Sequence, residues 1–318
     1  MSLPIYNQNL GIIGILAQSA TYTDCITFTG ETSDFTLKAS YKEWNGTVEY
    51  STNHNTWTTW NGSEISSSNK KLYLRGSGNT TFYTSKGARF VLSARAACSG
   101  NIQTLLEYSN PPTSIPAEYC YNGMFRSCKS LTQAPELPAT TLASYCYYYM
   151  FAYCSSLVQA PELPATTLVD KCYGNMFNGC TSLTTAPALP ATTLADSCYS
   201  GMFYGCTSLT QAPELPATTL ASYCYNYMFF NCTSLTRAPK LPATTLANYC
   251  YSGMFYNCTK LKISTTQSSS YPTAWRIPSS GTISSEPNGW NSNMLSGTGG
   301  TFTSNPSINT TYYGAWTK

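Results

Sequence analysis

The stretch "MFNGCTSLTTAPALPATTLADSCYSGMFYGC", residues Met176–Cys206, contains the motif Met-Phe-x-x-Cys twice, 26 residues apart. The motif occurs six times at that spacing, beginning at Met124, Met150, Met176, Met202, Met228 and Met254. A catalytic motif occurs once in a chain, whereas a fixed period of about 20–50 residues indicates stacked structural units. We therefore expect a solenoid of six repeats over residues 101–261.

Each repeat has two limbs. In "LASYCYYYMFAYC", residues Leu142–Cys154, constant residues recur every four positions, close to the 3.6-residue period of a helix. The preceding "ATT" offers a threonine N-cap, so we predict one short helix per repeat, with the Met-Phe pairs in the core. The other limb, "LTQAPELP", predicts a parallel strand of about three residues, because its recurrent proline lacks an N–H group.

Different patterns flank the repeats. Residues 21–100 carry short alternating segments separated by turns, which predicts a small antiparallel β-sandwich after an N-terminal segment 1–20. In residues 262–318, Met294 and Thr298 align with Met254 and Cys258 after an insertion of 14 residues. The stretch Phe302–Thr311 then follows "LTQAPELPATT", so we predict a degenerate repeat that caps the open end. The predicted fold class is mixed α+β.

Composition excludes several classes of function. Charged residues make up only 10% of the 318 residues and the net charge is +3, without the basic patch that nucleic acid requires. The longest apolar run, Leu10–Ala17, is far shorter than the roughly 20 residues of a membrane span. It also lacks a basic n-region, so an export signal is not evident in this chain.

The cysteines are expected to be structural. Twelve of the 14 lie in the repeats in pairs eight residues apart, which on a helix is about 12 Å and too far for a disulfide. No Cys-x-x-Cys pair occurs and the only histidine is His54, so no zinc site is expected. We predict that the repeat cysteines are reduced and buried, whereas pairing of Cys25 with Cys98 stays open.

Catalysis is not expected either. His54 lies in a predicted turn without a serine or aspartate partner in view. The acidic row Glu136, Glu162 and Glu214 is interrupted by Ala188 and Lys240 at the same repeat position, which a catalytic acid would not tolerate. We predict that the protein is not an enzyme and binds no cofactor or metal.

The run Met-Phe-x-x-Cys-x-Ser-Leu and its return to Leu-Thr-x resemble the BspA-like leucine-rich repeats and the 26-residue repeat of bacterial surface proteins. The resemblance covers about half of the chain. It implies a right-handed solenoid with a parallel sheet on one side, and a role in adhesion or in binding host or partner surfaces. Alanine and proline at strand positions depart from the family pattern and argue against a long regular sheet.

These observations predict a non-enzymatic surface-exposed protein that binds a protein or glycan partner. A phage tail or fibre component that recognises a bacterial surface is the alternative, and an accessory module of a carbohydrate-active enzyme is a more distant one. The predicted location is extracellular or on the cell surface, or on a virion in the phage alternative. The oligomeric state stays open.

Two faces of the solenoid are candidate binding sites. The variable pairs between the constant residues are rich in Tyr, Ser, Asn and Gly, as antibody paratopes are. The tyrosines of this face are Tyr145, Tyr148, Tyr149, Tyr153, Tyr223, Tyr227, Tyr249 and Tyr256. The alternative is the concave strand face, with Gln133, Glu136, Gln159, Glu162, Gln211, Glu214 and Arg237. Trp44, Trp57 and Trp60 can stack on sugars, but one or two of them are expected in the sandwich core.

Overall fold

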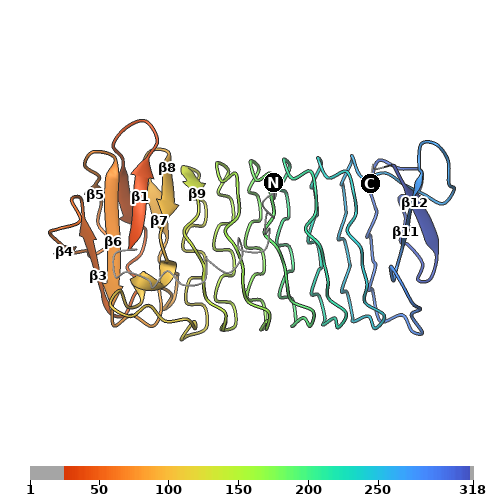
Figure 1. Ribbon diagram of the computed structural model, residues 1–318, viewed down its shortest axis with the longest axis horizontal. Helices are drawn as coiled ribbons and strands as arrows, with labels where there is room; N and C mark the ends of the chain where they lie inside the picture. Colours follow the sequence, from red (N-terminus) through yellow and green to blue (C-terminus); the bar gives the residue numbers. More distant parts are fainter. Residues whose placement is uncertain (1–24, 316–318) are drawn as a thin grey trace, which may run out of the picture.

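The computed structural model describes residues 25–315, so the expected segment 1–20 and the run Leu10–Ala17 lie outside the described residues. Within them the chain forms twelve short strands, one 3-10 helix and a long series of turns. Figure 1 shows the repeats stacked in a row, with a group of strands at each end. No helix of this part is long and apolar enough to cross a membrane.

The N-terminal strands form two sheets. One has six strands in the order β4-β3-β6-β1-β8-β9, and the other has the order β5-β2-β7. The strands are β1 Ile26–Gly30, β2 Thr36–Ala39, β3 Thr47–Ser51, β4 Thr58–Thr59, β5 Ile65–Ser66, β6 Lys71–Ser77, β7 Phe90–Leu92, β8 Ala96–Ser99 and β9 Leu131–Gln133.

Side-chain alternation builds the core between these sheets. Every second residue of β1 is buried, and the Phe28 ring lies 6.5 Å from the rings of Phe35 and Phe90. Trp44 and Trp60 are also buried, and their rings stack 5.2 Å apart. Two of the three tryptophans considered for sugar stacking therefore fill the core.

Cys25 and Cys98 do not form a disulfide, and the register of β1 and β8 explains why. Cys98 lies opposite Phe28 in the register of β1 and β8 and is fully buried on the core face. Cys25 precedes Thr27 by two residues and therefore shares the outer face of the sheet with it. The two thiols lie on opposite faces of one sheet.

The six-stranded sheet continues into the solenoid. β9 belongs to the first repeat and pairs in parallel with β8, placing Leu131 opposite Ala96. The N–H of Phe90 donates to the carbonyl of Met124 at 2.7 Å. In the next repeat the equivalent carbonyl, that of Met150, accepts from Phe125 of the preceding coil. The N-terminal sheets thus take the place of a preceding coil and close that end of the solenoid.

The predicted short helices are wrong, and with them the mixed α+β class, because the described chain contains no α-helix. Instead, backbone N–H groups alternate between two kinds of acceptor. Tyr147 donates to the carbonyl of Cys172 in the next coil at 3.0 Å, whereas Tyr148 donates to Tyr145 three residues back at 3.1 Å. The next residue, Tyr149, donates across to Gly174 at 3.1 Å. Half of the backbone bonds therefore join neighbouring coils, which an α-helix cannot do.

A left-handed residue recurs at every fourth position of these turns. In the second coil these are Tyr145, Tyr149 and Tyr153, with φ of 57°, 54° and 62°. One such residue interrupts an α-helix, because a continuous helix needs right-handed dihedrals throughout. The four-residue spacing was therefore real, but it reflects a repeating pair of tight turns. The expected threonine N-cap is also wrong, because there is no helix to cap.

Identical side chains stack between coils to form the core. The Tyr147 ring lies 5.8 Å from that of Tyr173, and the Phe151 ring lies 5.7 Å from that of Phe177. The repeat cysteines are at most 2% exposed and form no disulfide, as predicted. The Cys154 thiol donates to the carbonyl of Phe125 in the preceding coil at 3.0 Å, and most later coils repeat this bond.

The strand limb is less regular than a continuous sheet. In the described repeats only β9 forms a strand, and later coils are joined by isolated bridges such as Gln159 with Thr185. The recurrent prolines explain this, because each removes a donor that a ladder needs.

The C-terminal part forms a further coil and a small sheet. Phe255 donates to the carbonyl of Met294 at 3.0 Å, the bond that joins Phe229 to Met254 one coil earlier. The Thr298 hydroxyl, at the position of the repeat cysteine, donates to the carbonyl of Leu295 at 2.9 Å. The strands β10 Ile263–Ser264, β11 Thr273–Arg276 and β12 Thr311–Gly314 pair in the order β10-β12-β11. We propose that residues 262–318 act as the cap.

Candidate functional site

Most of the predicted tyrosines occupy left-handed positions of the turns. Six of the eight have φ between 53° and 62°: Tyr145, Tyr149, Tyr153, Tyr223, Tyr227 and Tyr249. The sequence predicted that they project from helices, and this prediction is wrong. We call the surface formed by these turns the turn face.

Side chains at these positions lean over the following coil. A Cβ atom built on Gly179 would lie 2.6 Å from Cδ1 of Tyr153, and one on Gly253 would lie 2.2 Å from Cδ1 of Tyr227. Where the following coil has a tyrosine instead of a glycine, the two rings stack, as Tyr223 and Tyr249 do at 4.9 Å. Tyr153 and Tyr227 thus rest on glycines and Tyr223 on another ring, whereas Tyr145 meets Lys171.

This backbone accounts for part of the composition that suggested a binding face. Glycine and asparagine adopt left-handed dihedrals at little cost, so their enrichment follows from the turns. The scarcity of lysine and glutamate also loses its force, because no helix is present to favour them. The tyrosines remain unexplained by backbone preference, since a large side chain gains nothing from a left-handed conformation.

The turn face carries two aromatic clusters instead of one row. The N-terminal tyrosine cluster comprises Tyr119, Tyr145, Tyr148, Tyr149 and Tyr153, and the C-terminal aromatic cluster comprises Tyr204, Tyr223, Tyr227, Phe230, Tyr249 and Tyr256. Between them the left-handed positions are held mainly by small residues: Asn175, Gly179, Ser197, Gly201 and Gly205. Sequence reasoning missed Tyr119, Tyr204 and Phe230, although all three lie in the variable pairs.

The N-terminal tyrosine cluster is tied to cations. The Arg126 guanidinium lies 4.9 Å from the ring centre of Tyr149, and Lys171 Nζ donates to the Tyr145 hydroxyl at 2.8 Å. That hydrogen bond raises the pKa of Lys171, while burial raises the pKa of Tyr148 to about 12. Tyr145, Tyr148 and Tyr149 are therefore engaged within the protein, whereas Tyr153 is 42% exposed.

Among residues 25–315, no ion pair or cation–π contact joins a charged side chain to the C-terminal aromatic cluster. Tyr204, Phe230 and Tyr256 stack at 4.4 and 4.7 Å with nearly parallel rings. Tyr223 and Tyr227 are 42% and 40% exposed, and the neutral residues Ser222 and Asn226 precede them in the chain. The result is an exposed aromatic surface with neutral hydrogen-bonding groups at its edge.

The alternative residues of the strand face gather in two depressions. One, of about 830 Å³, is lined by Gln133, Glu136, Gln159 and Glu162 and by the prolines of the first two coils. The other, of about 850 Å³, is lined by Gln211, Glu214 and Arg237 and also by Lys240. The first has acidic side chains without a basic one, whereas the second has both signs of charge.

The repeat thiols are poorly suited to chemistry. Burial raises the pKa of Cys120 and Cys172 to about 12, so neither forms a reactive thiolate near neutral pH. Among residues 25–315, no three His, Cys, Asp or Glu side chains converge on a point where a metal ion could bind.

The fold and its faces define a class of protein: a solenoid whose turns stack side chains inward and present aromatic residues outward. The family model for the BspA type leucine-rich repeat region matches six copies, over residues 106–225 and 144–272. This region is more than half of the chain, and the chain belongs to that family. Neither the curated proteins nor the solved structures contain a match to it.

Membership suggests a repeat-based protein-binding role. Proteins of this family are typically surface-associated and generally not enzymes.

Proposed function

We propose that the protein is a non-enzymatic, surface-exposed binding protein that recognises a protein or glycan partner through the C-terminal aromatic cluster. The observation that supports this is the exposure of Tyr223, Tyr227 and Tyr249, between 36% and 42%, on a surface that no cation of the described residues contacts. Tyrosine contributes a large contact area at low cost in side-chain entropy, and it is enriched among residues that dominate binding energy.

The strand face is the competing site within the same proposal. Its glutamines and glutamates are long and exposed, so fixing them in a complex costs more side-chain entropy than fixing a tyrosine. Its two depressions also differ in charge, so one repeating ligand would not suit both. These considerations favour the turn face.

The test begins with an array of glycans and surface proteins probed with the intact chain, to obtain a ligand. The turn-face variant then combines Tyr223→Ser, Tyr227→Gly and Tyr249→Ser, because Ser197 and Gly201 already occupy the equivalent positions. We expect binding to weaken at least tenfold, since each lost hot-spot tyrosine costs about 1–2 kcal/mol or more.

The matched control changes the strand face in the same way. Gln159→Thr, Glu162→Ala and Gln211→Thr introduce residues that Thr185 and Ala188 supply at the equivalent positions. Binding by this variant should be nearly unchanged. If the control loses affinity while the turn-face variant keeps it, and both melt like the parent, the strand face is the site.

A further inference from the structure

Tyr227 and Tyr149 have equivalent positions in the repeat but different surroundings. Each follows a glycine one coil earlier, Gly201 before Tyr227 and Gly123 before Tyr149, so no side chain from that position reaches the ring. Tyr149 is partly buried, whereas Tyr227 is 40% exposed. A side chain that covers the first ring and not the second accounts for this difference.

Arg126 covers the ring of Tyr149. Its guanidinium carbon lies 4.9 Å from the centre of the ring, within the range of a cation–π contact. A Cβ atom built on Gly123 would lie 3.7 Å from Cβ and 4.0 Å from Cδ of Arg126, so the arginine side chain runs beside that glycine. The glycine thus leaves room for the arginine next to the ring.

The fourth coil has the same glycine but no arginine. Tyr204 stands at the repeat position of Arg126, and its ring stacks on Phe230 of the next coil at 4.4 Å. Within the described residues 25–315, no cation lies over the Tyr227 ring, and the ring recorded against it is that of Phe230, at 5.6 Å and nearly at right angles. Tyr227 therefore repeats the setting of Tyr149 without its cation.

Neighbouring groups favour a positive charge at this place. The amide of Asn175 reaches over Gly201, and its oxygen accepts a hydrogen bond from Asn178 Nδ2 at 3.1 Å, which leaves a second lone pair. Asp196, in the same coil as Gly201, is an exposed carboxylate that no ion pair of residues 25–315 neutralises.

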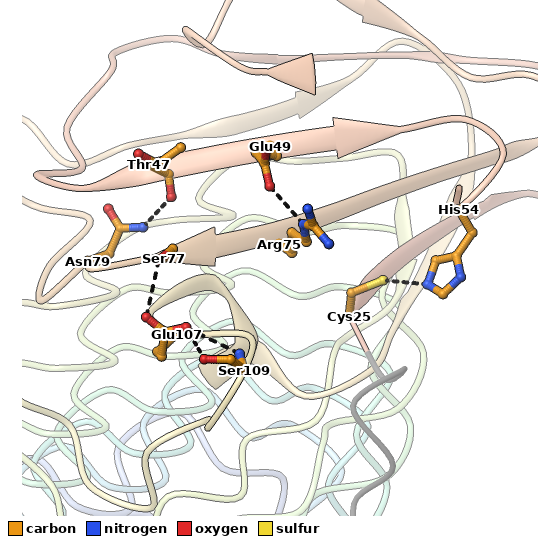
Figure 2. Close-up of polar contacts among 9 residues, drawn as sticks. All are labelled: Cys25, Thr47, Glu49, His54, Arg75, Ser77, Asn79, Glu107 and Ser109. Carbon is orange, nitrogen blue, oxygen red and sulfur yellow. Dashed lines mark hydrogen bonds and ion pairs between the residues drawn. The ribbon is translucent and has the colours of Figure 1, made fainter. Parts of the chain in front are cut away.

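A second arginine of the chain is held in the same way. The Arg75 guanidinium lies 4.1 Å from the ring centre of Trp57 and 4.3 Å from that of Tyr108. Its Nε also donates to Glu49 Oε2 at 2.8 Å, as Figure 2 shows. A guanidinium is flat and weakly hydrated, so it can lie against a ring and donate N–H bonds from its edge at the same time. An ammonium group is compact and strongly hydrated, and it does this less well.

We propose that Tyr227 binds the guanidinium group of an arginine of a partner protein. The arginine enters beside Gly201, covers the ring as Arg126 covers Tyr149, and donates an N–H bond to the Asn175 amide oxygen. This inference rests on the proposed function for its surface, the C-terminal aromatic cluster, and it narrows the partner to a protein. A neutral glycan offers no group of this kind.

The first test titrates N-acetyl-arginine N-methylamide into the intact chain with carbon-13 in its tyrosine rings, followed by nuclear magnetic resonance. The signal that disappears in Tyr227→Gly identifies the Tyr227 ring. We expect this signal to shift, and the arginine compound to bind about threefold more tightly than its citrulline analogue, which has the same shape without the charge. No shift at Tyr227, or equal affinity for the citrulline or the lysine analogue, would overturn the proposal.

Exchanges between the first and fourth coils test the site independently. Tyr204→Arg places an arginine of the chain beside Gly201, so the Tyr227 signal should no longer respond to the arginine compound. Arg126→Tyr uncovers Tyr149, whose signal should begin to respond. Should the second variant fold poorly, Arg126→Ala replaces it, because Ala152 occupies the same repeat position. Unchanged responses in the folded variants would refute the equivalence of the two sites.

Measurements with a partner separate this inference from the proposed function. A partner protein found on the array should lose affinity when its arginines in the interface are changed to lysine. A partner that needs the turn face but tolerates these changes overturns the arginine site and leaves the proposed function standing. A partner that binds the turn-face variant like the parent overturns the proposed function, whereas a shift of the Tyr227 signal with the arginine compound still supports the arginine site.

Discussion

The left-handed turns predict that replacing certain glycines by alanine lowers the free energy of unfolding. In a helical solenoid the same replacement would raise it. Gly253 and Gly123 occupy the same repeat position and have φ of 61° and 62°. Each donates its N–H to the next coil, at 2.7 Å to Ser292 and at 2.9 Å to Tyr148. The two glycines differ in the atoms that an added Cβ would meet. A Cβ on Gly253 would meet the Tyr227 ring at 2.2 Å, whereas on Gly123 the nearest atom is 3.7 Å away.

Alanine at either position must adopt the left-handed conformation, which costs about 1–2 kcal/mol. Gly253→Ala must also displace the ring of Tyr227, and overpacking of this kind costs about 1–3 kcal/mol more. We therefore expect the free energy of unfolding to fall by about 1–2 kcal/mol for Gly123→Ala and by about 2–5 kcal/mol for Gly253→Ala.

The assay is urea unfolding followed by circular dichroism, with calorimetry to detect stepwise loss of coils, which solenoids can show. Adding Tyr227→Gly to both variants closes a double-mutant cycle, and it should remove the difference between them. Equal destabilisation by the two alanines would refute the packing of the ring on Gly253. Stabilisation by both would refute the turns, because alanine in a helix is favoured over glycine by about 1 kcal/mol.

Two further predictions concern the ends of the molecule. Truncation after Lys262 removes the carbonyls that accept hydrogen bonds from the sixth coil, and it uncovers Met254 and Phe255. We therefore expect the truncated protein to aggregate on size-exclusion chromatography. A monomer with an unchanged melting temperature would contradict the role of residues 262–318 as a cap. At the other end, hydrogen bonds from Thr84, above all that of its hydroxyl, lower the pKa of Glu43 to about 2. The stability that this carboxylate contributes is fully present above pH 4.5 and is lost as the pH falls towards 2. Glu43→Gln should therefore lower the melting temperature at pH 7 and converge with the parent near pH 2, and a gap that is constant with pH would argue against this role.

Several features could be derived from the sequence because they depend on the repeat itself. The 26-residue period, the buried Met-Phe pairs and the reduced cysteines all follow from comparing each repeat with its copies. The alignment of Met294 with Met254 was also available, since a side chain that stacks on its neighbours must keep its position in the coil. The backbone bond from Phe255 to Met294 agrees with it.

The helix was mispredicted because a helix and a series of tight turns both place equivalent residues about four positions apart. Constant residues every four positions fit the 3.6-residue period of a helix, and they fit a pair of tight turns equally well. The choice between them depends on acceptors 25 residues away, such as the Cys172 carbonyl that receives the N–H of Tyr147. Local sequence does not contain that information. The recurrence of Gly and Asn every four residues, for which left-handed turns are favourable, was the overlooked signal.

The sequence by itself determined which side chains of each repeat face inward, because stacked copies must bury the same positions. Only the tertiary structure decided how the surface is arranged. Whether a tyrosine covers a glycine, stacks on another ring or meets a cation depends on the residue in the adjacent coil, as the different neighbours of Tyr153, Tyr223 and Tyr145 show. The contact of Cys25 with His54 likewise joins residues 29 apart, and it exists because the turn after β3 folds back beside the start of β1.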